Sequence, residues 1–263
     1  MPNQSSPYTI PGVALDERHI PRPIVIRPQW IAGGEDRPIH RHQREQLVYA
    51  DQGVMSVATV HGAWVVPPNR AVWVPSNLDH GVRMITDCHM LNVFLEPGRV
   101  AKLPKTCVVV SVPPLLQELL RHASTFEDEY DENGPQGRIM AVIIDAVQSL
   151  ETVPLHLPMP TDARLRRIAD AIISDPADNR SQADWAKVSG ASVRTLARLF
   201  PEQTGMTFSG WRQQARLMAA LERLAAGEPV VRVALDLGYT SQSAFIAMFK
   251  KALGTTPGKY FSD

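Results

Sequence analysis

The C-terminal part of this 263-residue chain contains one structural pattern twice, and this repeat limits the possible folds more than any other feature. Residues 181–200 read SQADWAKVSGASVRTLARLF, and residues 229–249 read PVVRVALDLGYTSQSAFIAMF. Each copy predicts a short helix, a tight turn that contains a glycine (Gly190 or Gly238) and a second helix that begins at a polar residue. This is the helix-turn-helix plan, whose second helix can lie in the major groove of DNA.

The segment between the two copies predicts a long helix over 207–226, ended by Gly227. Its apolar residues recur on one face: Trp211, Ala215, Met218, Leu221 and Ala225. A further helix is expected over 162–174, and Ser181 with Asp184 forms a capping-box pattern before the first copy. Region 162–263 is therefore expected to be an all-α domain with two helix-turn-helix units joined by a linker helix.

The helical period separates an inner from an outer face in each second helix. We expect Val193, Leu196, Ala197 and Phe200 to point inward in the first copy, and Phe245, Met248, Phe249 and Ala252 in the second. Outward positions carry side chains that can contact base edges or phosphates. The candidate DNA contacts are Ser192, Arg194, Thr195, Arg198, Ser241, Gln242, Ser243, Ile246 and Lys250, with Ala247 also facing outward. The alternative is a plain helical bundle with charged outer faces, but two matching units about 34 Å apart favour binding to successive major grooves.

The charge is divided along the chain although the net charge is zero. Residues 1–159 hold 13 Lys and Arg against 17 Asp and Glu, a net charge of −4, whereas residues 160–263 hold 14 against 10, a net charge of +4. This division favours a C-terminal half that binds phosphates. Two cysteines, no long apolar run and no secretion signal indicate a cytoplasmic protein without a membrane span.

The C-terminal motifs closely resemble those of the AraC/XylS family of bacterial transcription regulators. The matching segments are WAKVSGASVRTLARLF, TGMTFSGWRQQARLMAALERL and VALDLGYTSQSAFIAMFKKALGTTPGKY, and the resemblance runs through about 162–261. One departure is Pro201, which stands where a helix former is usual and could shorten the first recognition helix. The resemblance implies a transcription factor, an activator or a repressor, in which a variable sensor or dimerisation domain is coupled to the DNA-binding domain.

The N-terminal part has the pattern of a β domain followed by helices. Residues 1–30 are rich in proline and predict an extended arm, and short apolar runs from 30 to 112 predict strands of a barrel or sandwich. Two apolar helices are expected over 113–123 and 138–150, and the proline-rich segment 151–161 is expected to be a linker. We therefore expect an α+β protein with a barrel in 1–112, a helical pair for dimerisation in 113–150, a linker in 151–161 and the DNA-binding domain in 162–263.

Two segments of the expected barrel resemble the cupin motifs. Residues 34–53 match the first motif with His40 and His42, although Gln46 stands in place of the acidic ligand. In the second motif His80 is kept, Asn69 and Asn77 replace glycines, and Met84 occupies the polar end position. Asn tolerates the left-handed backbone that such turns require. The resemblance implies a cupin-like sensor barrel.

The three histidines are candidate ligands of a divalent transition metal such as Zn, Ni, Cu or Fe. The missing carboxylate leaves two other interpretations open: an organic effector pocket at an inherited metal position, or polar groups satisfied within the barrel. The candidate effector-binding residues are His40, His42, Gln46, Trp64, Trp73 and His80, with the two tryptophans also readable as core.

The sequence thus predicts a DNA-binding transcription regulator that senses a small-molecule or metal effector and is not an enzyme. The expected partners are double-stranded DNA, a small-molecule effector, a second copy of the chain and, for an activator, RNA polymerase. The alternative is a metal-dependent cupin enzyme with a helical appendage, which needs an intact metal site with open coordination positions.

Overall fold

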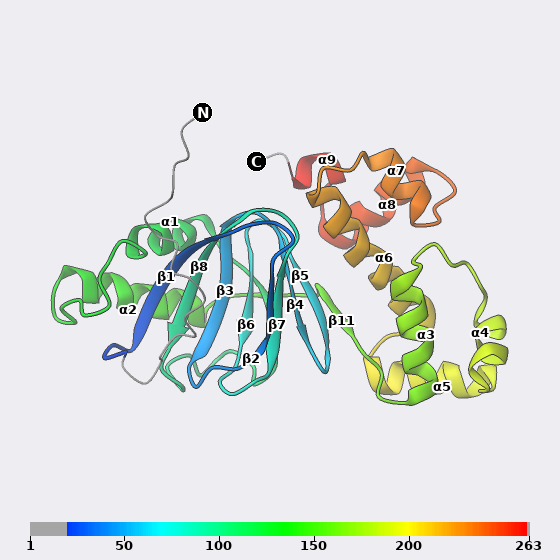
Figure 1. Ribbon diagram of the computed structural model, residues 1–263, viewed down its shortest axis with the longest axis horizontal. Coiled ribbons are helices and arrows are strands. Elements are labelled where there is room, and N and C mark those ends of the chain that lie inside the picture. The colour runs from blue at the N-terminus through cyan, green and yellow to red at the C-terminus, as the bar shows by residue number, and fades with distance from the viewer. Residues whose placement is uncertain (1–19, 262–263) are drawn as a thin grey trace. The chain divides into compact units, whose positions relative to one another are not determined.

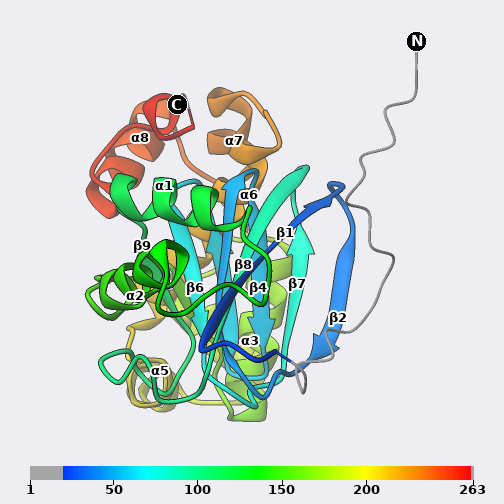
Figure 2. The ribbon, with the colours of Figure 1, turned by 90° about the vertical axis from the view of Figure 1, so that its left-hand side faces the viewer.

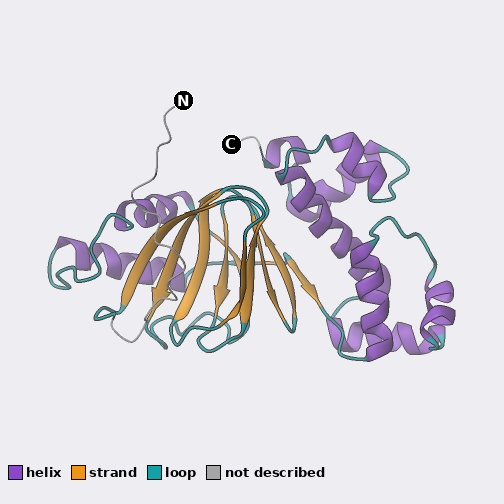
Figure 3. Cartoon of the chain, in the orientation of Figure 1, coloured by secondary structure: helices purple, strands orange, loops and turns teal. Residues whose placement is uncertain are grey.

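The computed structural model describes residues 20–261, which form two compact units (Figures 1 and 3). The N-terminal unit comprises the described residues up to Val57 together with Val66–Leu155. The C-terminal unit comprises His156 onward together with the short segment Ala58–Val65. Strands dominate the first unit and helices the second, as the sequence predicts for an α+β chain.

The strands form two open sheets, which we call sheet A and sheet B. The register given for strand pairs in both sheets is antiparallel. The expected closed barrel is therefore not present as one continuous sheet, because each sheet keeps two edge strands. Sheet A has the order β1 (Ile24–Ile31), β8 (Cys88–Leu95), β3 (Glu45–Gln52), β6 (Arg70–Val74), β9 (Val108–Ser111) and β10 (Thr152–Val153), and sheet B has the order β11 (His156–Pro158), β5 (Gly62–Val66), β4 (Met55–Thr59), β7 (His80–Met84) and β2 (Asp36–His40).

Two helices, α1 (Pro114–Ala123) and α2 (Pro135–Gln148), cover one face of sheet A (Figure 2). Alternate residues such as Leu47 and Tyr49 pack against both helices in one hydrophobic core. Because side chains alternate along a strand, Gln46 points to the opposite face. The sheet thus separates an apolar core under the helices from a face that carries polar groups.

Strand β1 differs from the expected proline-rich arm over 1–30. Residues 1–19 lie outside the described residues, but Ile24–Ile31 pairs along its whole length with β8. Pro28 is tolerated inside this strand because β1 is the edge of sheet A and needs hydrogen bonds on one side only. Within the described residues, Pro28 therefore belongs to an edge strand rather than to an extended arm.

The C-terminal unit contains the helices that the sequence predicts, with polar residues at most of their first turns. Ser181 and Asp184 form the expected capping box, and Ser192, Thr207 and Ser241 cap three further helices. Gly190, Gly205 and Gly254 end helices in the left-handed conformation. The helices are α3 (Ala163–Ser174), α4 (Gln182–Ser189), α5 (Val193–Thr204), α6 (Phe208–Ala225), α7 (Val230–Asp236), α8 (Gln242–Leu253) and α9 (Pro257–Tyr260).

Pro201 does not shorten α5, which continues to Thr204. A proline inside a helix removes one backbone hydrogen bond to the residue four positions earlier. Phe200 and Thr204 on either side are buried, and the amide of Gly205 donates to the carbonyl of Pro201 at 2.9 Å. Packing and this C-terminal bond therefore hold the last turn in place.

The expected linker over 151–161 contains two short strands. Thr152–Val153 pairs with β9, and His156–Pro158 pairs with β5. Within the C-terminal unit, Trp211 and Gln214 of α6 donate side-chain hydrogen bonds to the carbonyls of Pro158 and His156 at 2.7 and 3.1 Å. Both short strands of this segment are therefore held by hydrogen bonds, the first to β9 and the second to β5 and α6.

Both cysteines are buried free thiols. Burial raises the pKa of Cys88 to about 11 and that of Cys107 to about 12. In the part of the chain that the structure describes, no helix combines the length and apolar character needed to cross a membrane.

Candidate functional site

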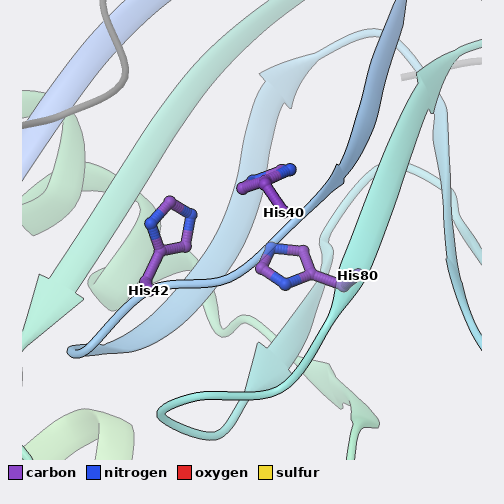
Figure 4. A group of neighbouring side chains, drawn as sticks. All are labelled: His40, His42 and His80. Carbon is purple, nitrogen blue, oxygen red and sulfur yellow. The ribbon is translucent and has the colours of Figure 1, made fainter.

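Three imidazole rings meet at one end of sheet B (Figure 4). His40 ends β2 and is the register partner of His80, which begins β7, while His42 follows β2 in the connection to β3. The ring centroids lie 4.4 Å apart for His40 and His80, 4.8 Å for His40 and His42, and 5.4 Å for His42 and His80. One ring nitrogen of each lies within 4.8 Å of the other two.

Two turns of the N-terminal unit contain an asparagine in the left-handed conformation, and one of them leads into His80. Asn69 and Asn77 both adopt φ of +61°, the left-handed conformation expected where asparagine replaces glycine. The backbone amide of Asn77 donates a 2.6 Å hydrogen bond to the carbonyl of His42. This bond fixes the loop after β2 against the turn that leads into His80.

Backbone carbonyls determine which ring nitrogen of His40 and of His80 can bind a ligand. Nδ1 of His40 lies 2.7 Å from the carbonyl oxygen of Pro38, and Nδ1 of His80 lies 2.9 Å from that of Leu78. Because a carbonyl can only accept, each Nδ1 carries the proton, and each Nε2 keeps its lone pair in the neutral ring. Metal-binding histidines typically donate their other ring N–H to a carbonyl or carboxylate in this way.

His80 is fully buried, and its Nε2 has no hydrogen-bond partner within residues 20–261. Burial, together with the neighbouring His40 and His42, lowers the pKa of His80 to about 4, against the opposing effects of the Leu78 carbonyl and Asp79. The ring is therefore neutral at physiological pH. A buried acceptor of this kind is destabilising unless something occupies it.

Gln46, at the expected position of the acidic ligand, is buried on β3. Its amide nitrogen donates to Oδ1 of Asn92 at 3.1 Å, and its Oε1 has no partner in the described chain. Its register partner Phe94 contacts the ring of His42 at 5.2 Å between centroids. Asn92 was not among the residues singled out from the sequence, although a lone amide inside the apolar run CHMLNVFL was an available signal.

The two candidate tryptophans have other surroundings. Trp73 belongs to the core under α1 and α2, on the face of sheet A opposite to that of Gln46. Its Nε1 donates a hydrogen bond to the carbonyl of Pro104. Trp64 lies flat against His156 of β11, with ring centroids 4.6 Å apart. The structure thus brings together His40, His42 and His80, whereas Trp73 serves the core and Trp64 packs on the linker strand.

The first recognition helix, α5, exposes Arg194 and Arg198 as expected. Ser192 caps this helix by accepting a hydrogen bond from the amide of Thr195 at 3.0 Å. Thr195 itself is half-buried. Arg198 forms an ion pair with Glu202 at 2.7 Å.

The buried face of α5 is rotated from the expected one. Val193 is 45% exposed and Ala197 is also exposed, whereas Leu199 is buried with Leu196 and Phe200. Leucine has more apolar area to bury than alanine, so the helix turns the larger side chain inward.

The second recognition helix, α8, buries Phe245, Met248 and Phe249 as expected, but Ala252 is exposed. A small residue in the last turn gains little from burial. Ile246 is half-buried, and the other outward candidates are exposed: Ser241, Gln242, Ser243, Ala247 and Lys250.

Comparisons with known proteins point to the same two-part organisation. Residues 185–263 match a family model described as a helix-turn-helix domain. The chain is 34% identical over 225 residues to the HTH-type transcriptional regulator NimR of Escherichia coli (strain K12), a match that covers 86% of this chain and 82% of NimR. The HTH-type transcriptional regulator RipA of Corynebacterium glutamicum is 34% identical over 103 residues, which cover 39% of this chain and 31% of RipA.

Among solved structures, ToxT from Vibrio cholerae aligns with 91% of this chain and 98% of its own, at 12% identity and a TM-score of 0.39. The match to NimR covers 86% of this chain, which includes parts of both units, and relates the chain to a transcription regulator.

Proposed function

Because the chain belongs to the AraC/XylS family of transcription regulators, we propose that its N-terminal unit senses a divalent transition metal through His40, His42 and His80. The chain is a DNA-binding regulator with helix-turn-helix units. The proposal concerns what the N-terminal unit recognises and which residues contact DNA. A regulator acts on chromosomal DNA, which implies the cytoplasm as its place of action.

The outward residues of α5 and α8 are proposed as the DNA contacts. They are Ser192, Arg194, Thr195, Arg198, Ser241, Gln242, Ser243, Ile246 and Lys250. Arginine can pair with guanine and glutamine with adenine, while serine and lysine suit phosphates and base edges. Two such helices in one chain bind successive major grooves when they lie about 34 Å apart.

The unpartnered Nε2 of His80 is the observation that supports the sensor proposal most strongly. It is buried, neutral and beside two further imidazoles whose nitrogens lie within 4.8 Å of one another. Three nitrogens around a tetrahedral Zn²⁺ lie about 3.4 Å apart at bond lengths of about 2.1 Å, so small side-chain rotations would complete the set. Gln46 is a poor ligand and leaves a coordination position for water or a small effector molecule.

A bound metal can regulate DNA binding only if its affinity differs between two states of the protein. His42 lies in the connection after β2 and His40 at the end of edge strand β2, so ligation would restrain this edge of sheet B. We infer that metal binding selects one conformation of strand β2 and of the connection that follows it.

The test is a cobalt(II) titration of metal-free protein, followed by visible absorption. Wild-type protein should bind one equivalent and develop the absorption of a nitrogen-rich site. His42→Ala and His80→Ala should weaken binding on the order of 100-fold, because each removes a ligand. His61→Ala is the matched control, since His61 is exposed and lies outside the cluster.

Wild-type protein without stoichiometric metal, or equal weakening by His61→Ala, would contradict the metal proposal. A metal-free protein whose DNA affinity responds to a small organic molecule would point to an effector pocket instead. The remaining alternative is a metal-dependent cupin enzyme, which the same three imidazoles could serve. Substrate turnover by the metal-loaded protein would favour it, whereas the relatives named above are regulators.

A homodimer formed through α1 and α2, and contact with RNA polymerase if the regulator is an activator, complete the proposed partners. The apolar sides of both helices are largely used by the core over sheet A. Leu115 and Val142 remain exposed at 70% and 49% and are the apolar groups available to a second copy.

A further inference from the structure

A pocket of about 290 Å³ lies between the linker helix α6 and the second helix-turn-helix unit. Ser209, Arg212, Gln213 and Arg216 of α6 line one side. Tyr239, from the turn before α8, and Met248, from α8 itself, line the other. All these residues belong to the C-terminal unit, and none is among the DNA contacts predicted from the sequence.

Arg216 is held in the pocket wall by uncharged acceptors. Its Nε donates to the carbonyl of Pro176 at 2.7 Å, and its Nη2 donates to the carbonyl of Asp178 at 3.3 Å and to Oδ1 of Asn179 at 2.9 Å. These bonds anchor the α3–α4 loop against α6. They fix the guanidinium without neutralising its charge.

Arg212 lies one turn earlier on α6 and uses only part of its hydrogen-bonding capacity. Its Nη1 donates to the carbonyl of Arg180 at 2.8 Å, and its guanidinium lies 5.3 Å from the ring centre of Phe208. A guanidinium has five N–H donors. Within the described chain its remaining donors have no partner, so Arg212 can bind a further acceptor.

No carboxylate within residues 20–261 forms an ion pair with Arg212 or Arg216, whereas most other arginines of this unit do have one. The two charges also act on each other: burial lowers the pKa of Arg216 and the charge of Arg212 lowers it further, against the opposing effects of Tyr239, Asp178 and Asp175. Two close cations without an ion-paired carboxylate favour a further anion between or beside them.

The pocket lies beside α8, the second proposed DNA-contacting helix, and the turn before it. Recognition helices contact base edges with their N-terminal residues. Tyr239 precedes the N-cap Ser241 by two residues, and Met248 adjoins the outward Ala247. A duplex that meets Gln242 and Ser243 would pass near the turn that carries Tyr239, which lines the pocket together with Arg212 and Ser209.

We propose that Arg212, with the Ser209 hydroxyl beside it and Arg216 behind it, binds a backbone phosphate of the DNA. The site would add a contact that does not depend on sequence, next to the second major-groove site, and would fix how α8 enters the groove. This inference depends on DNA binding alone and not on the histidine site. Failure of the metal titration would therefore leave it untouched.

The experiment measures the salt dependence of binding to a mixed-sequence duplex of about 30 base pairs, long enough for two successive major grooves. Fluorescence anisotropy over a series of NaCl concentrations gives the slope of log K against log salt. Arg212→Gln should weaken binding about tenfold and reduce the magnitude of the slope by about 0.9, the value for one phosphate contact. Arg212→Lys should restore most of the slope because it keeps the charge.

The matched control is Arg166→Gln on α3, which removes one exposed, ion-paired arginine from the same unit. It should leave the slope close to the wild-type value. A slope for Arg212→Gln that equals the wild-type slope overturns the proposal. Equal changes in both variants overturn it as well, since they would indicate a general effect of net charge. Circular dichroism of each variant confirms that the helices remain folded.

Discussion

At the scale of single residues, two histidines with a buried Nε2 show what separates a binding site from ordinary packing. His80 and His156 each have an Nε2 without a hydrogen-bond partner among the described residues. His80 faces two other imidazoles, whereas His156 lies flat on Trp64, with an angle of 7° between the ring planes. A buried ring nitrogen without a partner is therefore insufficient by itself, and convergence of several ligand atoms makes the site.

His156 predicts a loss of stability in acid. Burial lowers its pKa, so between its folded pKa and the unfolded value of about 6.5 the unfolded chain binds more protons than the folded one. The free energy of unfolding should therefore decrease as pH falls below about 6.5. His156→Gln should show a smaller decrease, measured by urea unfolding followed through tryptophan fluorescence at pH 7.5 and pH 5.

His80 contributes in the same direction, because its pKa is also lowered. The difference between wild type and His156→Gln isolates the contribution of His156. His61→Gln removes an exposed histidine and should keep the wild-type dependence. Identical pH profiles for wild type and His156→Gln would show that the ring is not held neutral by its surroundings.

At the scale of elements, local signals predicted helices and caps well because they depend on neighbouring residues. The capping box at Ser181 and the left-handed asparagines at Asn69 and Asn77 are examples. The predictions from the sequence were wrong where tertiary contacts determine the local structure. Pro28 is compatible with a strand only at a sheet edge, and the choice between Ala197 and Leu199 as the buried residue depends on what α5 packs against.

The candidate site shows the same division. The spacing of His40, His42 and His80 predicted a cluster, because motif spacing fixes which strand ends meet. The place of Trp73 could not be predicted, since strand alternation gives two faces but does not say which one the helices cover. The pocket at Arg212 combines α6 with α8 and the turn before it, and had no local signature.

The recognition helix α5 predicts unequal roles for its two arginines. Arg194 forms no ion pair within residues 20–261, whereas Arg198 is paired with Glu202 and must exchange that partner for DNA. Arg194→Ala should therefore weaken specific binding by about 1–3 kcal/mol, and Arg198→Ala by less. The measurement is anisotropy with an operator selected from a random-sequence library.

Lys187→Ala on α4 is the control, because it removes an exposed cation from the first helix of the same unit. It should have a smaller effect on specific binding than Arg194→Ala. Equal losses for all three variants would indicate that α5 contributes charge alone and does not read bases. A loss for Arg198→Ala that exceeds that for Arg194→Ala would contradict the ranking.

At the scale of the whole molecule, the chain combines halves of opposite charge at zero net charge. An acidic N-terminal half is repelled by DNA and leaves contact with the duplex to the basic half. It is also the half that carries α1 and α2, the proposed dimerisation helices. Association through these helices would double the number of recognition helices on one operator.

The dimer can be tested directly. Leu115→Glu with Val142→Glu places charge on the exposed apolar positions of α1 and α2 and should shift the protein from dimer to monomer at micromolar concentration. Size-exclusion chromatography with light scattering measures the mass. Leu235→Glu, on an exposed leucine of α7, should leave the mass unchanged. A wild-type mass of one chain throughout a dilution series would contradict the dimer.

The two sulfhydryl groups have a practical consequence for following this regulator at work. Cys88 and Cys107 are the chain's only cysteines, and both are buried with little thiolate at neutral pH. Alkylating dyes react with thiolates, so a cysteine introduced on the surface would be labelled while the two native cysteines react little. The native chain is thus ready for single-molecule fluorescence without first replacing its own cysteines.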